Sequence, residues 1–152
     1  MIKKIITGLF AVFACFSAFG QHSTTVNAVL NDSLKSLYIQ QKLEYKNLSP
    51  DTLDVIYLND WINAFSDTRT PLARRFFEDY DRDFHFARQE KRGNTTVNSI
   101  MANNNLLPWK RPDGHPDLIM ITPAAPLLPG EKLEISLNYT IKIPSEDFTR
   151  YG

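Results

Sequence analysis

The clearest pattern in the chain is near its C-terminal end, where apolar and polar residues alternate from Leu133 to Ile143. A period of two puts alternate side chains on opposite faces of a strand, so this segment predicts a β-strand with one buried face. Ser36–Asn47 alternates in the same way, with a polar residue, Gln41, at one position of the apolar set. Two long, half-buried strands indicate a sheet with one face on a core.

Several shorter segments have the composition of β-strands and are separated by residues that favour turns. Asn103, Asn104 and Asn105 tolerate positive φ and predict a tight turn. The segment 123–130 is rich in proline, which excludes a helix there. The predicted shorter strands are 24–30, 53–58, 94–102, 106–110 and 117–122.

The loop Asn47–Asp51 predicts how two of these strands pair. Its proline fixes φ, and its Asn and Asp side chains can bond nearby backbone groups. Since a loop of about this length joins antiparallel neighbours, we expect strands 36–47 and 53–58 to form a hairpin.

One segment departs from the strand pattern and predicts a short helix near residues 71–80. Thr70 suits the N-cap and Pro71 suits the first helical position. The strongly charged segment 81–93 that follows predicts an exposed stretch of chain. The apolar residues that share one face of the helix are Leu72, Phe76, Phe77 and Tyr80.

This order of elements is typical of a mainly β protein. It predicts an antiparallel β-sandwich or a saddle-shaped sheet, with one short helix near 71–80. The 132 residues that follow position 20 are enough for one hydrophobic core and not for two. We therefore expect a single β domain over residues 21–152.

The N-terminus has the pattern of a signal peptide over residues 1–20. Two lysines precede a short apolar block that ends at Ala14, and small residues precede a cleavage site before Gln21. The apolar block is too short to span a membrane. An alternative interpretation makes Cys15 a lipidated cysteine, although Phe13 is bulky for such a signal. The pattern predicts an exported protein, periplasmic or extracellular, with no membrane span after cleavage.

Loss of the signal peptide changes the charge and removes the cysteine. Without Lys3 and Lys4, 15 of the 17 basic residues remain against 17 acidic residues, a net charge of −2. No basic field is left to hold nucleic acid, which excludes a nucleic-acid partner. Cys15 is the only cysteine, so disulfides, thiolate metal sites and cysteine nucleophiles are excluded in the mature chain.

The sequence contains no catalytic motif. His22, His85 and His115 are scattered over a terminus, a charged segment and a loop, and no H-E-x-x-H brings two histidines onto one helical face. No G-x-S-x-G elbow is present for nucleophilic hydrolysis. We expect these histidines to be structural or to face solvent.

Four acidic residues match part of a calcium-binding loop. The sixth position of such a loop is a glycine that permits a sharp turn, and here that position is Phe84. We therefore favour a solvated acidic helix end over a calcium site. The four residues, at loop positions 1, 3, 5 and 12, are Asp79, Asp81, Asp83 and Glu90.

The two tryptophans are candidates for ligand contacts. If exposed, they would bind a carbohydrate or a peptide, Trp61 together with Phe65 and Trp109 together with Lys110 and Arg111. The cores of β-sandwiches also bury tryptophan, and we favour core positions for both.

A family resemblance emerges from longer stretches. Leu43 to Leu58, LEYKNLSPDTLDVIYL, resembles the Y-x-N-x-S-P-D-T-L-x-x-I segment that opens aminopeptidase-N-type zinc metallopeptidases, the gluzincin aminopeptidases, and most of all their exported bacterial branch. The resemblance covers nearly all of the mature chain, and its motifs are structural. The other stretches similar to this branch are WINAF at 61–65, TPLARRFFEDYDRDFHF at 70–86, PGEKLEISLNYTIKIP at 129–144 and FTRYG at 148–152.

The resemblance implies the noncatalytic N-terminal β domain of such a protein. That domain packs on a thermolysin-like catalytic domain, which would be the partner of this chain within one polypeptide. It forms one side of the cleft that receives a peptide substrate. Zinc is implied for the full-length protein, but the zinc-binding motif, its downstream glutamate and the motif for the α-amine of the substrate have no counterpart here. No catalytic, cofactor-binding or metal residue is assigned to this chain, and we do not expect it to be active alone.

The end of the sequence points to a longer protein. The strand 133–143 is followed by only a short segment, which would leave its apolar edge without neighbours, so we expect the front part of a longer chain. The alternative is a stand-alone exported β-sandwich that binds a peptide or glycan through Trp61 and Trp109. A docking domain would aggregate alone, whereas a stand-alone module would be a soluble monomer.

Overall fold

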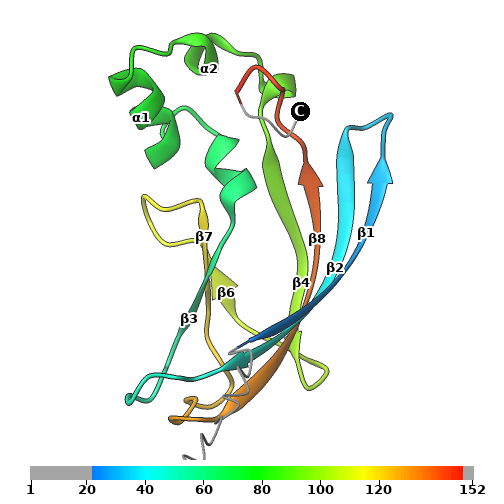
Figure 1. The fold of residues 1–152 in the computed structure, drawn as a ribbon, viewed down its shortest axis with the longest axis vertical. Coiled ribbons are helices and arrows are strands. Elements are labelled where there is room, and N and C mark those ends of the chain that lie inside the picture. The colour runs from blue at the N-terminus through cyan, green and yellow to red at the C-terminus, as the bar shows by residue number, and fades with distance from the viewer. Residues whose placement is uncertain (1–21, 149–152) are drawn as a thin grey trace, which may run out of the picture.

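The computed structural model describes residues 22–148. It is a mainly β structure of two antiparallel sheets that face each other, with short helices at one end (Figure 1). The predicted fold class, an antiparallel sandwich or saddle-shaped sheet with a short helix near 71–80, is confirmed. The predicted signal peptide 1–20, the lipidation alternative at Cys15 and the segment 149–152 lie outside the described residues.

The larger sheet contains the two segments with the strongest alternation at its centre. Its strand order is β1-β2-β8-β4-β5, and every neighbouring pair is antiparallel. The ladder between β4 and β8 is interrupted by a register shift between Val97 and Ser99. The strands are β1 (Ser23–Asn31), β2 (Ser36–Lys46), β4 (Asn94–Ala102), β5 (Asn105–Leu106) and β8 (Lys132–Lys142).

The smaller sheet covers part of one face of the larger sheet. It consists of β3 (Ile56–Asn59), β7 (Leu118–Ile121) and β6 (Trp109–Lys110), in the order β3-β7-β6. Short helical segments connect the sheets: η1 (Trp61–Phe65), α1 (Pro71–Glu78), α2 (Asp83–Phe86) and η2 (Gln89–Lys91). Among the described residues, no helix is long and apolar enough to cross a membrane.

The main core lies between the two sheets. Alternate residues of β8 and β4 point into it, while their neighbours form the polar outer face of the larger sheet. Isoleucine and leucine dominate because branched aliphatic side chains fill the space between two pleated sheets. The buried members of this core are Ile56, Ile100, Ala102, Leu107, Ile119, Ile121, Leu127, Ile135 and Leu137.

The predicted hairpin between residues 36–47 and 53–58 is wrong. β2 pairs with β1 and β8, whereas β3 pairs with β7 in the other sheet. The loop between β2 and β3 bonds to the segment before β8: Leu53 and Leu127 exchange backbone hydrogen bonds of 3.0 and 2.9 Å. These bonds direct the chain across to the smaller sheet, so β3 cannot fold back on β2.

The strand predicted at 106–110 is also wrong, because the segment divides between the two sheets. Leu107 donates to the Ile100 carbonyl at 2.9 Å and buries its side chain in the core. Pro108 follows and has no N–H for a ladder, which separates β5 from β6. The turn predicted at 103–105 is confirmed for Asn103 and Asn104, with φ of 50° and 62°, whereas Asn105 already begins β5.

The predicted helix is confirmed as α1, with Thr70 at its N-cap. Its predicted apolar face is only partly correct, because Leu72 and Phe76 pack on a core whereas Phe77 and Tyr80 are exposed. The Thr70 hydroxyl accepts from the Ala73 N–H at 3.1 Å and donates to the Ala64 carbonyl at 2.7 Å, so it ties α1 to η1.

The expectation that 81–93 is wholly exposed is wrong, because Phe84 is completely buried. With Phe65 and Ala73 it forms a second, smaller core beneath the helices.

Candidate functional site: the cleft beside Trp61

A cavity of about 260 Å³ opens where the cover provided by the smaller sheet ends. Its floor is the inner face of β2, β4 and β8, and its wall is formed by the end of β3 and the start of η1. Most of its lining is aliphatic, and the polar groups come mainly from Gln41, Asp60 and Tyr139. Its size and character suit a small apolar group that makes one or two hydrogen bonds.

Tyr139 and Gln41 carry the hydrogen-bonding groups of the floor. The Tyr139 hydroxyl donates to the Gln41 Oε1 at 2.9 Å, between neighbouring strands β8 and β2. Burial raises the pKa of the Tyr139 phenol, and the negative charge of Asp60 raises it further. The phenol therefore stays neutral up to high pH and keeps a fixed donor at the base of the cavity.

Asp60 connects the wall of the cavity to the rest of the fold. Its carboxylate accepts from the Thr95 hydroxyl at 2.6 Å and forms an ion pair with the Arg111 guanidinium at 2.7 Å. It also caps η1, since its Oδ1 accepts from the Asn63 N–H. The Asn63 amide in turn donates to the Pro116 carbonyl at 2.7 Å and accepts from the Thr95 N–H at 3.1 Å. η1 is thus held against β4 and the loop before β7.

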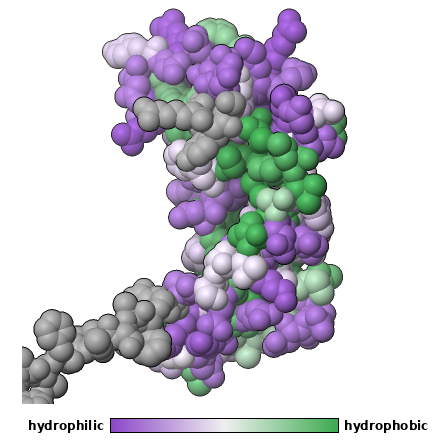
Figure 2. Space-filling view, turned by 45° about the vertical axis from the view of Figure 1, so that its right-hand side comes forward, coloured by the Kyte–Doolittle hydropathy of each residue, from purple (hydrophilic) through white to green (hydrophobic). Residues whose placement is uncertain are grey.

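The inner face of the larger sheet continues past the cavity without cover from the smaller sheet. The register places Leu30 beside Leu37 and Leu37 beside Ile141, which lines the edge of the cavity, and all three lie outside the main core. Leu30 is 60% exposed, and Val26 on the same face of β1 is 51% exposed. Figure 2 shows hydrophobic residues gathered in one continuous region on the upper half of the molecule, flanked by hydrophilic residues.

The segment on which the resemblance mainly depends forms a tightly bonded loop. Asn47 is completely buried, and its amide nitrogen donates to the carbonyls of Asp51 at 2.8 Å and Leu127 at 2.9 Å. Its amide oxygen accepts from the backbone N–H and the hydroxyl of Ser49, both at 3.0 Å. The N-x-S-P-D pattern therefore has a structural role, because it joins the end of β2 to the segment before β8.

The expectation that both tryptophans lie in the core is wrong. Trp61 is 54% exposed and packs edge to face on Phe65 with ring centroids 6.0 Å apart, and Trp109 is 38% exposed on an edge strand. Trp61 lines the cavity and Trp109 does not. The structure therefore gives the two residues separate surroundings rather than one aromatic platform.

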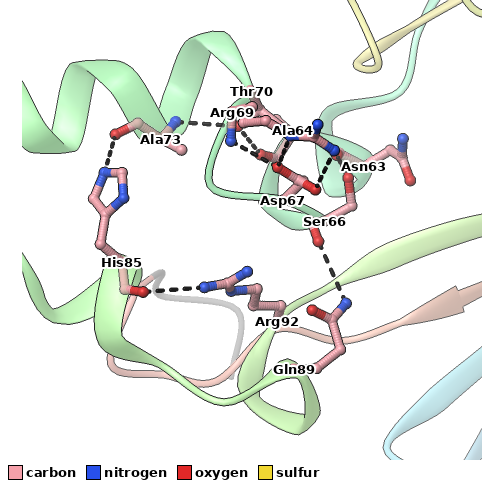
Figure 3. A network of polar contacts seen from close by, with 10 residues as sticks. All are labelled: Asn63, Ala64, Ser66, Asp67, Arg69, Thr70, Ala73, His85, Gln89 and Arg92. Atoms are coloured by element: carbon pink, nitrogen blue, oxygen red, sulfur yellow. Dashed lines mark hydrogen bonds and ion pairs between the residues drawn. The ribbon is translucent and has the colours of Figure 1, made fainter.

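The three histidines lie apart from one another. His22 stacks on Tyr45 with ring centroids 4.9 Å apart, and His115 is exposed in the loop before β7. The Nε2 atom of His85, from α2, is 3.0 Å from the carbonyl oxygen of Ala73 in the first turn of α1 (Figure 3). Its role is to hold the two helices together.

The acidic residues considered for calcium are spread over several elements. Asp79 caps the end of α1, Asp83 begins α2, and Glu90 lies in η2. Zinc, which the resemblance implies for a full-length protein, needs three or four convergent ligands. Within residues 22–148, no three His, Cys, Asp or Glu side chains are grouped to hold a metal ion. The described residues do not fit a zinc site.

Sequence reasoning missed the residues that build this site. Asp60 carries a local signal, since an aspartate directly before a helical turn is typical of an N-cap. Arg111 and Tyr139 carry no such signal, because their roles depend on residues distant in the sequence.

No protein-family model matches the chain, and no curated protein matches it. The family resemblance therefore rests on the quoted stretches alone.

Proposed function

We propose that the chain is the noncatalytic N-terminal β domain of an exported zinc aminopeptidase-like metallopeptidase. In this role it docks on a catalytic domain and forms one wall of the cleft that receives a peptide. The activity of the whole protein would be the removal of N-terminal residues by zinc-activated water, with a glutamate as general base. This chain would position and enclose the substrate rather than react with it.

The observation that carries the proposal is the part of the inner face that lies outside the main core. Leu30, Leu37 and Ile141 lie next to one another on the larger sheet and outside the main core. Soluble monomers rarely leave a large contiguous apolar patch in water, and such a patch is typical of a surface that packs on another domain. The outer face of the same strands is mostly polar, and its exposed apolar residues are Val29 and Tyr38.

The bonded loop around Asn47 supports the proposal independently. Its buried side chain gives a physical reason for the N-x-S-P-D pattern that this chain shares with the family, because that pattern fixes where the larger sheet passes to the smaller one. The similarity thus concerns residues that determine the architecture, as expected for two related β domains.

The first test is to read the coding sequence past codon 152 for an H-E-x-x-H followed by a further glutamate. If the motif is present, the catalytic domain encoded there is produced separately and its binding to this chain is measured by titration calorimetry. Ile141→Asp should abolish binding, because it places a charge in the apolar patch. Thr140→Asp, on the opposite face of the same strand, should bind like the unmodified chain.

Two results would contradict the proposal. One is the absence of the zinc-binding motif from all three forward frames. The other is equal binding of the catalytic domain by the Ile141→Asp and Thr140→Asp variants, which would show that the inner face is not the contact surface.

The second candidate function is a stand-alone exported module that binds a peptide or a glycan. The cavity beside the exposed Trp61 favours it, since aromatic side chains at the mouth of a cavity bind both kinds of ligand. Short peptides and oligosaccharides can be titrated against tryptophan fluorescence. Binding that is lost in Trp61→Ala and kept in Trp109→Ala would support this function. If the unmodified chain binds none of these ligands, this function is excluded.

A further inference from the structure

The strand β1 is a long and unprotected sheet edge. It is the first strand in the order of the larger sheet, all nine of its residues are exposed, and within residues 22–148 no other strand pairs with its outer side. Its sequence, STTVNAVLN, contains no charged residue, proline or glycine. Proteins usually protect such edges with lysine, proline or a bulge. The other edge strands, β3, β5 and β6, have four, two and two residues.

The hydrogen-bond pattern shows which backbone groups of β1 are open. On the β8 side, Ile143 donates to the Lys35 carbonyl at 2.9 Å and Asn47 donates to the Glu131 carbonyl at 2.8 Å, so odd-numbered residues of β2 bond toward β8. Antiparallel ladders alternate, so the even-numbered residues of β2 bond toward β1. Their partners in β1 are odd-numbered. The residues whose N–H and C=O groups point to the open edge are therefore Thr24, Val26, Ala28 and Leu30.

We propose that β1 pairs edge to edge with β1 of a second copy of this chain, antiparallel and about a two-fold axis at Asn27. This register brings Thr24 opposite Leu30 and Val26 opposite Ala28, so the outward-pointing residues face one another. The two larger sheets would then form one continuous sheet across the axis. The proposal goes beyond the proposed function and does not depend on it.

A second copy fits this edge better than an unrelated strand, for two reasons. The register keeps each face intact: Val26 and Leu30 lie on the apolar inner face, and they meet inner-face residues of the other copy. β1 also carries no charge, so an identical strand meets no like-charge repulsion across the axis. The contact is isologous, which closes the assembly as a dimer.

Cysteine cross-linking tests both the contact and its register. Asn27 would face its own copy in a non-hydrogen-bonded pair, where Cα atoms lie about 4.5 Å apart, within the disulfide range of about 4.4–6.8 Å. Thr25 would face Val29, and two Thr25 residues would be about 13 Å apart along the strand. Each is replaced by cysteine in the full chain, with Cys15→Ser in both. Asn27→Cys should form a covalent dimer under mild oxidation, and Thr25→Cys should not.

Sedimentation equilibrium provides a measurement that needs no cysteine. The unmodified chain should shift from monomer to dimer as its concentration rises. Ala28→Pro removes one N–H from the open edge and none from the ladder with β2, so it should lose the dimer, while Ala28→Val should keep it. Far-UV circular dichroism checks that both variants fold, and the cysteine pair decides the matter if the proline variant does not.

Three results would overturn the proposal. One is equal cross-linking of the Asn27→Cys and Thr25→Cys variants. Another is a dimer that persists in a folded Ala28→Pro variant. The third is an unmodified chain that stays monomeric at every concentration. If that chain binds a synthetic peptide of different sequence along β1, the edge is instead a site for extended peptides.

Discussion

Asp60 and Arg111 are 51 positions apart in the sequence and form an ion pair with 2.7 Å between Oδ2 and Nη2. The Asp60 side chain is 7% exposed and the Arg111 side chain is 22% exposed. The same guanidinium donates to the carbonyls of Pro116 and Thr95. One charged pair therefore joins η1, β4 and the loop before β7, and it fixes the wall of the cavity.

Arg111→Met should destabilise the protein by about 3 kcal/mol, because it leaves the buried Asp60 carboxylate without its cation. The methionine retains most of the apolar stem, so the loss reports on the charge. The measurement is the free energy of unfolding from urea titration monitored by circular dichroism.

The matched control is Lys132→Met. Lys132 forms a pair of the same length, 2.7 Å, with Glu44, but both side chains are about half exposed. Water solvates the two charges separately, so this substitution should cost less than about 1 kcal/mol. Equal losses for the two variants would contradict the importance of the Asp60–Arg111 pair.

Asn47→Asp should cost about 3 kcal/mol or more, although the two side chains have nearly the same shape. The substitution replaces the amide donor with a carboxylate oxygen that faces the carbonyls of Asp51 and Leu127. Those carbonyls lose their partner, and a charge is buried against them. The midpoint of urea unfolding at neutral pH measures the loss.

The control for this loop is Ser49→Ala, which removes one hydroxyl from a half-buried position. It should cost about 1 kcal/mol. If Asn47→Asp were no more harmful than Ser49→Ala, the buried amide would not be what joins the two sheets.

The elements that were predicted well are those whose pattern is local. The alternation in β8 and the residue types in β4 depend on one buried face, and the N-cap of α1 depends on Thr70 and its immediate neighbours. The pairing of β3 with β7 could not be predicted, because it depends on bonds from Asn47 and Leu53 to a segment far along the chain. Strand existence is a local property, whereas strand pairing is not.

The candidate site was harder to predict than the fold. Trp61 was considered from the sequence, but its exposure depends on how η1 is held by Asp60, which no local pattern reveals. The cavity floor requires Tyr139 and Gln41 to be side by side, and that follows from the register of β2 with β8. Phe84 was predicted to be exposed and is buried, because one aromatic residue in a charged segment has no periodic pattern to mark it as buried.

Phe84→Ala should cost about 3–5 kcal/mol, since it empties the centre of the smaller core. The Phe84 ring lies 5.6 Å from the Phe76 ring and 5.2 Å from the Phe148 ring, centroid to centroid, and the Arg92 guanidinium lies over its face at 5.1 Å. Thermal and urea unfolding would measure the change.

Phe86→Ala is the matched control, two positions away in the same short helix. Its side chain is 83% exposed, so its removal should change the stability by less than about 0.5 kcal/mol. Similar losses from the two substitutions would mean that the helical segment is not packed around Phe84.

The alkaline stability of the protein should depend on Tyr139. Burial, and then the charge of Asp60, raise the pKa of this phenol in the folded state. The unfolded state therefore loses the proton first, near pH 10, which is the usual pKa of tyrosine. The stabilisation is fully present below that pH and is lost as the pH rises through the folded pKa.

Tyr139→Phe removes the ionisable hydroxyl together with its hydrogen bond to Gln41. Below pH 10 this variant should be the less stable of the two by about 1 kcal/mol, and its deficit relative to the unmodified protein should shrink as the pH rises further. Gln41→Met removes the hydrogen bond but keeps the phenol buried, so its alkaline dependence should remain. Free energies of unfolding at several pH values above 9 measure both effects. A Tyr139→Phe deficit that stays constant across that range would show that the buried phenol does not control the alkaline stability.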